Sequence, residues 1–249
     1  MKPFDFLRLP PALSHPIAPV RQLDALVGEG PVFVLAPHPD DESIGCGGLI
    51  AACAAAGVPV FVHVLTDGRH SHPGSRAWPP ERIAERREAE ARRAGALLGL
   101  APEALRFERE LDGSLLFDWA NANNVAARIA EQASRWRAPI VVAPWRADPH
   151  PDHMAASVIA DLVEQACHGA RGLRYLVWAK NSRAIIAEAA ERDGAVRFPI
   201  SSYRKHKRRA VGAYLSQSGR LITDTAKPRS LPRLSSFLGR YETYLLSTV

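Results

Sequence analysis

The chain has 249 residues, of which 47% are hydrophobic, so it can bury a sizeable core, which argues against a disordered protein. Its three cysteines are few and odd in number and form no CxxC pair, which argues against a disulfide framework and a thiolate zinc site. The formal net charge of +6 suits acidic partners but does not choose among them.

The N-terminal residues do not resemble a secretion signal. Asp5, Arg8 and several prolines interrupt the apolar run that such a signal needs. The longest apolar stretch, 49–65, contains Gly57 and Pro59, and its two halves predict a helix followed by a strand. We therefore expect no transmembrane segment and a cytoplasmic protein.

The first third of the chain predicts a βαβ unit. A Pro-rich lead-in over 1–30 precedes a short apolar run at 32–36, which is typical of a buried strand in a parallel sheet. A helix is expected over 43–56, because Gly57 follows as a helix end, and a second buried strand is expected over 58–65.

The rest of the chain continues this alternation. Helices are expected over 80–98, 119–135, 154–167 and, as a basic helix, 203–217, and strands over 105–107, 139–144, 173–179 and 195–200, the last pairing with 173–179. No linker separates a second domain. The pattern predicts one Rossmann-like, doubly wound α/β domain over 31–249, with a mostly parallel sheet and helices on both faces.

Three glycines lie in the first expected helix. Gly45, Gly47 and Gly48 have the composition of a phosphate-binding loop but not its GxGxxG order. We expect them to allow close packing of the helix onto the sheet. A dinucleotide cofactor is not indicated.

Two polar turns of similar sequence follow two of the expected buried strands. The first is PHPDDE at 37–42 and the second is PHPDH at 149–153. Ligands bind outside the carboxyl ends of the strands in an open parallel sheet, so the two turns can converge on one crevice. Histidine and aspartate supply nitrogen and oxygen ligands that suit Zn²⁺. The two turns together predict a metal site that keeps acid and base groups to spare.

The alternative is that both turns simply cap helices, since Asp is a common N-cap residue and Pro a common first-turn residue. That explanation is adequate for either turn taken singly. It does not explain why both turns follow an apolar strand, or why together they carry more imidazole and carboxylate groups than helix capping needs. A purely structural zinc is disfavoured because such sites are usually rich in cysteine.

The two turns resemble the motifs of the PIG-L/LmbE-like family of zinc-dependent deacetylases. Weaker similarities extend the resemblance over about 32–217, and they are Thr66-Asp67-Gly68, Arg87-x-x-Glu90, Leu98-Gly99, Asp112-Gly113 and Tyr214-x-Ser216-Gln217. The resemblance implies a Rossmann-like sheet and removal of an N-acyl group, acetyl first of all, from an amino sugar. N-acetylglucosamine in a glycoconjugate, a glycolipid, a thiol-sugar, an antibiotic or a nucleotide-linked sugar is the implied substrate.

By that resemblance His38, Asp41 and His153 would bind one Zn²⁺ per chain, with other divalent metals as alternatives. Asp40 would be the general base beside the attacking water. The chemistry agrees, because zinc activates water near neutral pH and polarises the amide carbonyl while a carboxylate accepts the proton.

The resemblance leaves three supporting roles in the two turns. His150 would stabilise the oxyanion or donate a proton to the leaving amine. Asp152 could orient His150, and Glu42 could support the first turn from behind the ligands.

Four further residues are candidates for substrate contact. Arg69 and Arg76 lie in the loop after the second strand, and Asp112 belongs to the Asp112-Gly113 pair. Lys207 lies on the basic helix, which the resemblance places near the mouth of the pocket, where five cations would suit an anionic part of the substrate. The alternative for this helix is an ordinary solvated face.

Two other functions remain open. The same zinc chemistry would serve an amidase that acts on a non-sugar or thiol-conjugate acyl amide. The basic run at 204–209 could bind nucleic acid nonspecifically, but no recognised nucleic-acid module accompanies it, so a nucleic-acid partner is not expected. We expect a small-molecule or glycoconjugate substrate, and the sequence does not encode the oligomeric state.

Overall fold

The computed structural model describes residues 18–178, 187, 190–191, 194–225 and 237–247. Seven strands form one sheet in the order β3-β2-β1-β4-β5-β7-β6. The strands are β1 Val32–Ala36, β2 Val60–Thr66, β3 Leu105–Glu110, β4 Ile140–Pro144, β5 Arg171–Tyr175, β6 Ala195–Pro199 and β7 Tyr241–Leu246. In that order the first five strands, β3, β2, β1, β4 and β5, are parallel to one another, and β7 runs antiparallel to both β5 and β6. The expected mostly parallel, Rossmann-like sheet is confirmed.

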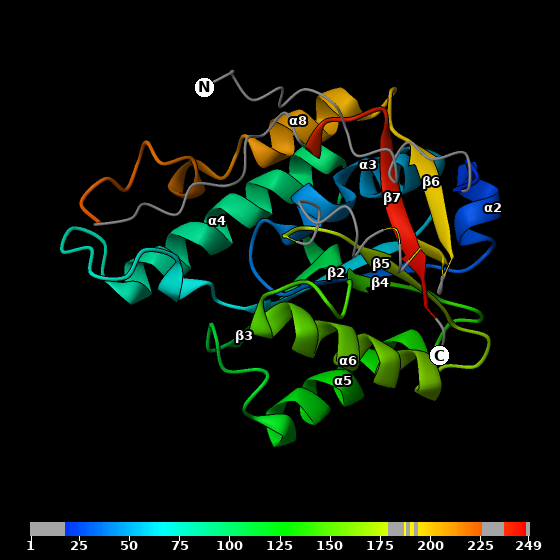
Figure 1. The fold of residues 1–249 in the computed structure, drawn as a ribbon, viewed down its shortest axis with the longest axis horizontal. Helices are drawn as coiled ribbons and strands as arrows, with labels where there is room; N and C mark the ends of the chain where they lie inside the picture. The colour runs from blue at the N-terminus through cyan, green and yellow to red at the C-terminus, as the bar shows by residue number, and fades with distance from the viewer. Residues whose placement is uncertain (1–17, 179–186, 188–189, 192–193, 226–236, 248–249) are drawn as a thin grey trace.

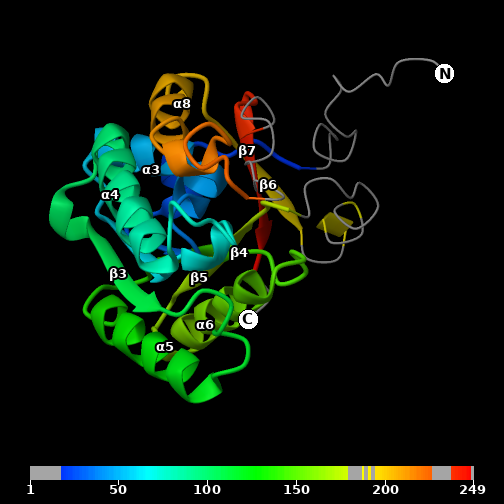
Figure 2. The ribbon, with the colours of Figure 1, turned by 90° about the vertical axis from the view of Figure 1, so that its left-hand side faces the viewer.

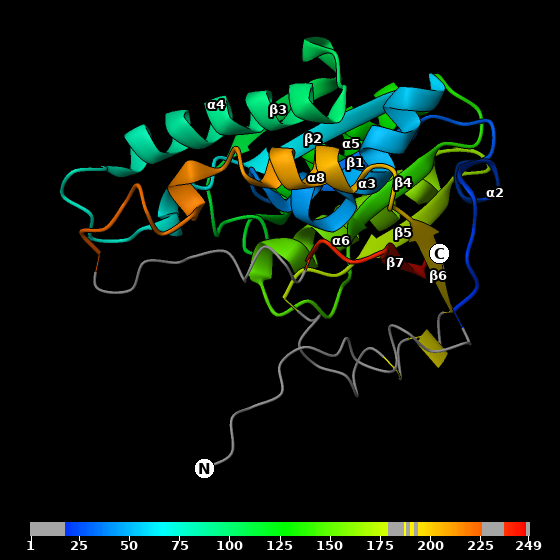
Figure 3. The ribbon, with the colours of Figure 1, turned by 90° about the horizontal axis from the view of Figure 1, so that it is seen from above.

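Helices cover both faces of this sheet. The described helices of five or more residues are α2 Leu23–Val27, α3 Asp41–Ala56, α4 Pro80–Leu98, α5 Trp119–Ala133, α6 Pro151–Ala166 and α8 Arg204–Val211. Helices α3, α4 and α8 lie on one face, and α5 and α6 lie on the other (Figures 1 and 2). Seen from above, the layer of α3, α4 and α8 lies over the sheet (Figure 3).

Strand β1 shows why the apolar run at its position is continuous. Val32, Val34 and Ala36 pack into the core under α3 and α4, whereas Phe33 and Leu35 pack into the core under α5 and α6. All five side chains are buried, because a central parallel strand is covered on both faces.

The C-terminal edge of the sheet differs from the expectation. The strand at 195–200 was expected to pair with the strand at 173–179, but β7 lies between β5 and β6. The prediction missed β7, although its sequence, YETYLL, is rich in residues that favour strands. Position 179 lies outside the described residues.

The basic helix is also shorter than expected. Instead of one helix over 203–217, α8 ends at Val211, and a separate 3₁₀ turn covers Leu215–Gln217. Gly212 follows α8 directly, and glycine is costly inside a helix, so the chain turns there.

Helix α3 packs closely against the sheet and its neighbours, which confirms the expected role of its glycines. A Cβ atom on Gly45 would lie 2.3 Å from the ring of Tyr175, and one on Gly48 would lie 2.4 Å from Cγ2 of Ile200. The helix is interrupted at Cys46, where φ is −139°.

A buried ion pair supports α3 just after this interruption. The backbone N–H groups of Gly48 and Leu49 donate to the carboxylate of Glu242, at 2.7 and 2.9 Å. Lys207 from α8 donates to the same carboxylate at 2.6 Å, and both side chains are almost wholly buried. Strand β7 and helix α8 therefore hold the helix that begins with the first polar turn.

Part of the lead-in packs onto the domain. Leu26 and Val27 of α2 belong to the core under α3, and Val20 forms a bridge to Arg197 of β6. The division of the chain at residue 30 stays a prediction. None of the described helices combines the length and the apolar character needed to cross a membrane.

Candidate active site

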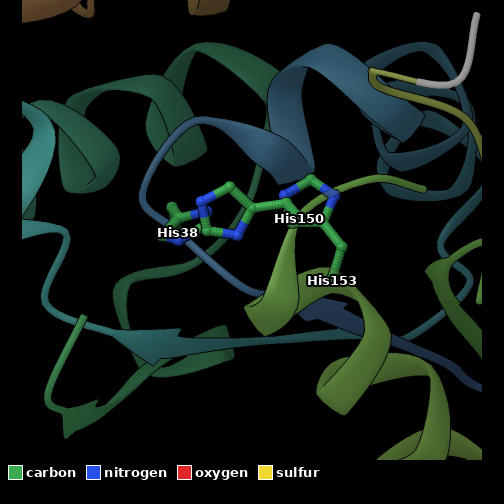
Figure 4. Close-up of side chains that lie close together, drawn as sticks. All are labelled: His38, His150 and His153. Carbon is green, nitrogen blue, oxygen red and sulfur yellow. The ribbon is translucent and has the colours of Figure 1, made fainter. Parts of the chain in front are cut away.

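The two polar turns meet at one edge of the sheet. Strands β1 and β4 are parallel neighbours, so their carboxyl ends lie side by side, and one turn follows each of them. His38 comes from the first turn, and His150 and His153 come from the second (Figure 4). One nitrogen atom from each of the three rings lies within 4.8 Å of the other two.

Asp41 lies at the centre of this cluster. Its Oδ2 is 3.1 Å from Nδ1 of His38 and 3.2 Å from Nε2 of His153. The far nitrogen of each ring faces another carboxylate, Asp152 at 3.1 Å from His38 and Asp148 at 3.5 Å from His153. Histidine ligands of metals are usually held in this way by a carboxylate behind the ring.

The charges around these rings favour a bound cation. Burial acts to lower the pKa of His153, but the neighbouring Asp41 carboxylate raises it to about 9. Burial acts in the same direction on His38, whose contacts with Asp112, Asp152 and Asp41 raise its pKa well above the usual value. Two buried nitrogen donors and one carboxylate in a field that favours positive charge fit a divalent zinc ion.

Asp40 occupies a strained position beside the cluster. Its φ of 134° is rare for a residue with a side chain, and such strain persists only where the surroundings enforce it. Its backbone N–H donates to Oε2 of Glu42 at 3.1 Å, and Arg87 lies 3.2 Å from its Oδ1 while donating to the carbonyl of Pro39 at 2.6 Å. Burial raises the pKa of Asp40 to about 7, although Arg87 acts to lower it.

The side chain of Glu42 is buried and held by hydrogen bonds from three groups. Besides the Asp40 N–H it accepts hydrogen bonds from Ser43 Oγ, at 2.5 Å, and from the hydroxyl of Tyr214. Its side chain thus ties the strained residue of the first turn to the segment that follows α8.

His150 is the N-cap residue of α6 and is half-buried. Its Nδ1 accepts a hydrogen bond from the backbone N–H of Asp152 at 3.3 Å, which assigns the proton of the neutral ring to Nε2. Burial, followed by the charges of His38 and His153, lowers the pKa of His150 to about 4. Asp152 therefore contacts His150 through its backbone, while its carboxylate bonds to His38 and to the N–H of Gly113.

Of the four residues expected to contact the substrate, one lines the cavity and three do not. Asp112 lies at the site, with Oδ1 3.4 Å from Nε2 of His38. Arg69 instead pairs with Asp67 and Glu81, outside the lining of the cavity.

Arg76 and Lys207 are likewise not at the cavity. Arg76 is exposed, and its backbone N–H donates to Asp224. The expectation that Lys207 contacts the substrate was wrong, because its side chain is buried against Glu242 and cannot reach a substrate.

A cavity of about 70 Å³ adjoins the cluster. Its lining comprises His38, Asp40, Asp41, Ile44, Ser71, Arg87, Asp112, His150, Val177, Trp178 and Gln217. No role was expected for Asp148, which lies behind His153 and precedes the second turn at the same sheet edge.

Trp178 was not expected at the site either. The strand predicted over 173–179 includes this residue, whereas β5 ends at Tyr175.

Comparisons with known proteins identify the family of this chain. The model of the GlcNAc-PI de-N-acetylase family, PIG-L, matches residues 33–166, a span that contains both turns. A 1D-myo-inositol 2-acetamido-2-deoxy-alpha-D-glucopyranoside deacetylase from Kineococcus radiotolerans is 32% identical over an alignment of 165 residues, and the match covers 54% of this chain and 45% of that relative. The match thus spans less than half of the relative's length.

Solved structures share the fold. The N,N'-diacetylchitobiose deacetylase from Pyrococcus horikoshii has a TM-score of 0.64 and 17% identity, over 97% of this chain and 87% of that one. A zinc-inhibited form of a teicoplanin deacetylase has a TM-score of 0.60 and 19% identity, over 87% and 97%. Because the family match covers more than half of the sequence and includes both polar turns, the chain belongs to the PIG-L/LmbE-like deacetylase family.

Proposed function

We propose that this chain removes the N-acetyl group from an amino sugar of the glucosamine type in a glycoconjugate, with one zinc ion bound by His38, Asp41 and His153. The observation that carries the proposal is the position of the Asp41 carboxylate between the two imidazoles, beside the strained Asp40. The relatives support the substrate class, because the Kineococcus and Pyrococcus proteins are deacetylases of acetamido sugars.

A zinc ion at this position would activate water and polarise the amide carbonyl. Asp40 then accepts the proton of the attacking water, because a carboxylate whose pKa is about 7 is a base matched to neutral pH. Glu42 fixes the backbone of Asp40, and Arg87 fixes its carboxylate, so the base is held in one orientation. Such positioning lowers the entropy cost of the proton transfer.

His150 suits the stabilisation of the oxyanion better than the protonation of the amine. Its ring is neutral near pH 7, and its Nε2–H is the free donor, since Nδ1 accepts from the backbone of Asp152. A neutral donor can bond to the oxygen that gains charge during the attack. Asp40, once protonated, is then the acid available to the leaving amine.

A screen of acetate release tests the proposal. The zinc-loaded protein is assayed on N-acetylglucosamine, its glycosides and its phosphorylated derivatives, and in parallel on N-acetyl amino acids and acylated thiol conjugates. We expect release from the sugars and none from the Asp40→Asn variant. Hydrolysis confined to the non-sugar amides would replace the proposal with the amidase alternative.

A further inference from the structure

The lining of the cavity has one apolar side. Eight of its eleven residues are polar or charged, and the remaining three are Ile44, Val177 and Trp178. Ile44 and Val177 are 2% and 3% exposed, so they form the closed part of this wall. Trp178 is 39% exposed and therefore belongs to the rim.

The cavity is too small for a whole glycoconjugate. Pockets that enclose small ligands usually measure about 300–1,000 Å³, whereas this one measures about 70 Å³. It can enclose the reacting end of a substrate, and the part beyond the amide-bearing sugar must then lie outside, across the rim.

Trp178 is held at a fixed place on that rim. Its backbone N–H and that of Val177 donate to Oδ2 of Asp148, at 2.9 and 3.0 Å. Oδ1 of the same carboxylate faces Nδ1 of His153. One buried side chain therefore contacts an expected metal ligand and also fixes the backbone from which the exposed indole projects.

Other exposed apolar side chains lie on the segments that carry the site. Leu111, next to Asp112 in the chain, is 48% exposed, and Met154, next to His153, is 39% exposed. Exposed apolar side chains on these segments are available for contact with an apolar part of a ligand.

We propose that Trp178 determines specificity by binding an apolar aglycone, an aryl or alkyl group attached to the amino sugar. This inference rests on the proposed function. The acyl group is the less suitable occupant, because the closed end of the cavity has room for a short acyl chain only. A phosphorylated aglycone would place a charged group, and no apolar surface, against the exposed indole face.

Kinetics on a matched series of substrates test the inference. The series contains N-acetylglucosamine, its methyl, hexyl and phenyl glycosides, and a glycoside with a second sugar as the aglycone. The variants are Trp178→Ala, Trp178→Phe and the control Trp136→Ala, because Trp136 is 42% exposed but packs on Phe61, away from the cavity lining.

For the unmodified protein, we expect the hexyl and phenyl glycosides to have a KM about tenfold below that of the methyl glycoside, with kcat similar. Trp178→Ala should abolish this difference by raising the KM of the hexyl and phenyl glycosides to that of the methyl glycoside, while Trp178→Phe keeps most of the difference. Trp136→Ala should change neither value.

Three outcomes would overturn the inference while acetate release continues. These are equal KM values for all glycosides, an equal loss on every substrate in Trp178→Ala, and a loss of the preference in the control Trp136→Ala as large as in Trp178→Ala. Absence of acetate release from every sugar would instead contradict the proposed function, so the two failures are distinguishable.

Discussion

The two polar turns share the string His-Pro-Asp and the same place after a buried strand, but the helix that follows begins at a different point in each. In the first turn Asp40 is the N-cap residue, and α3 begins at Asp41. In the second turn His150 is the N-cap residue, and α6 begins at Pro151. The residue that follows the string is thus the first residue of α3, as Asp41, and the third residue of α6, as His153. Counting from the histidine, we call it the fourth residue.

This shift gives equivalent residues different tasks. The third residue of the first string, Asp40, takes a strained backbone and turns its carboxylate to Arg87 beside the cavity. The third residue of the second, Asp152, is helical and wholly buried, and its carboxylate holds His38. The fourth residues, Asp41 and His153, contact each other at the centre of the cluster. Equal spacing in sequence therefore does not mean equal geometry.

The largest effect is expected from His153→Ala, compared with His150→Ala in the same turn. Loss of a ligand should remove most of the zinc from about one ion per chain, and with it the activity. His150→Ala should keep the zinc and lose only rate. Elemental analysis with acetate release measures both quantities, and His206→Ala, an exposed residue of α8, is the control.

Equal loss of zinc in the two variants would make His150 a ligand. Its ring nitrogen lies close enough to those of His38 and His153 for that outcome to be informative.

The next effect compares the third and fourth residues of the first turn. Asp40→Asn should keep the zinc and lose about 10²–10⁴-fold in kcat, because an amide cannot take the proton of water. Asp41→Asn should lose zinc as well as rate, because its carboxylate lies between the two imidazoles. If the two variants had the same zinc content and the same rate, the division between base and ligand would be wrong.

The convergence of the two turns could be predicted from sequence because it depends on local signals. Each turn follows an apolar strand, and the strand ends of a parallel sheet share one edge. The residue at which each helix begins could not be predicted in the same way. Nothing in His-Pro-Asp specifies whether the helix begins at the proline, as in α6, or just after the aspartate, as in α3. The strain at Asp40 is supported by Glu42 within the turn and by Arg87, which contacts the turn from α4.

The burial of Lys207 could not be predicted from the sequence. This residue lies among five exposed basic or histidine side chains of α8, and its type suggests solvent. Its burial depends on Glu242, which lies 35 residues later on a strand that was not predicted. Asp148, by contrast, precedes the second turn by one residue, and a search for carboxylates beside candidate ligands would have found it.

A smaller effect is expected from Asp148→Asn, which tests the support of the second turn. The amide keeps an oxygen for the backbone N–H groups of Val177 and Trp178 but removes the charge that faces His153. Loss of such a supporting carboxylate typically costs about 10–100-fold in metal affinity or activity. Zinc titration gives the affinity, and Asp118→Asn at the exposed start of α5 is the matched control. Unchanged affinity would show that His153 needs no carboxylate behind it.

The smallest effect on turnover is expected from the cations of α8, of which Lys207 supports α3 through Glu242. Lys207→Met leaves Glu242 buried without its ion pair, so the free energy of unfolding should fall by about 3–5 kcal/mol. Lys205→Met, at an exposed position of the same helix, should change neither stability nor KM. Denaturant unfolding and steady-state kinetics on neutral and phosphorylated sugars measure both properties. Glu242→Gln added to Lys207→Met should recover part of the stability, because the uncompensated charge is removed. A raised KM for the phosphorylated sugar alone, with normal stability in Lys207→Met, would instead return this lysine to the substrate.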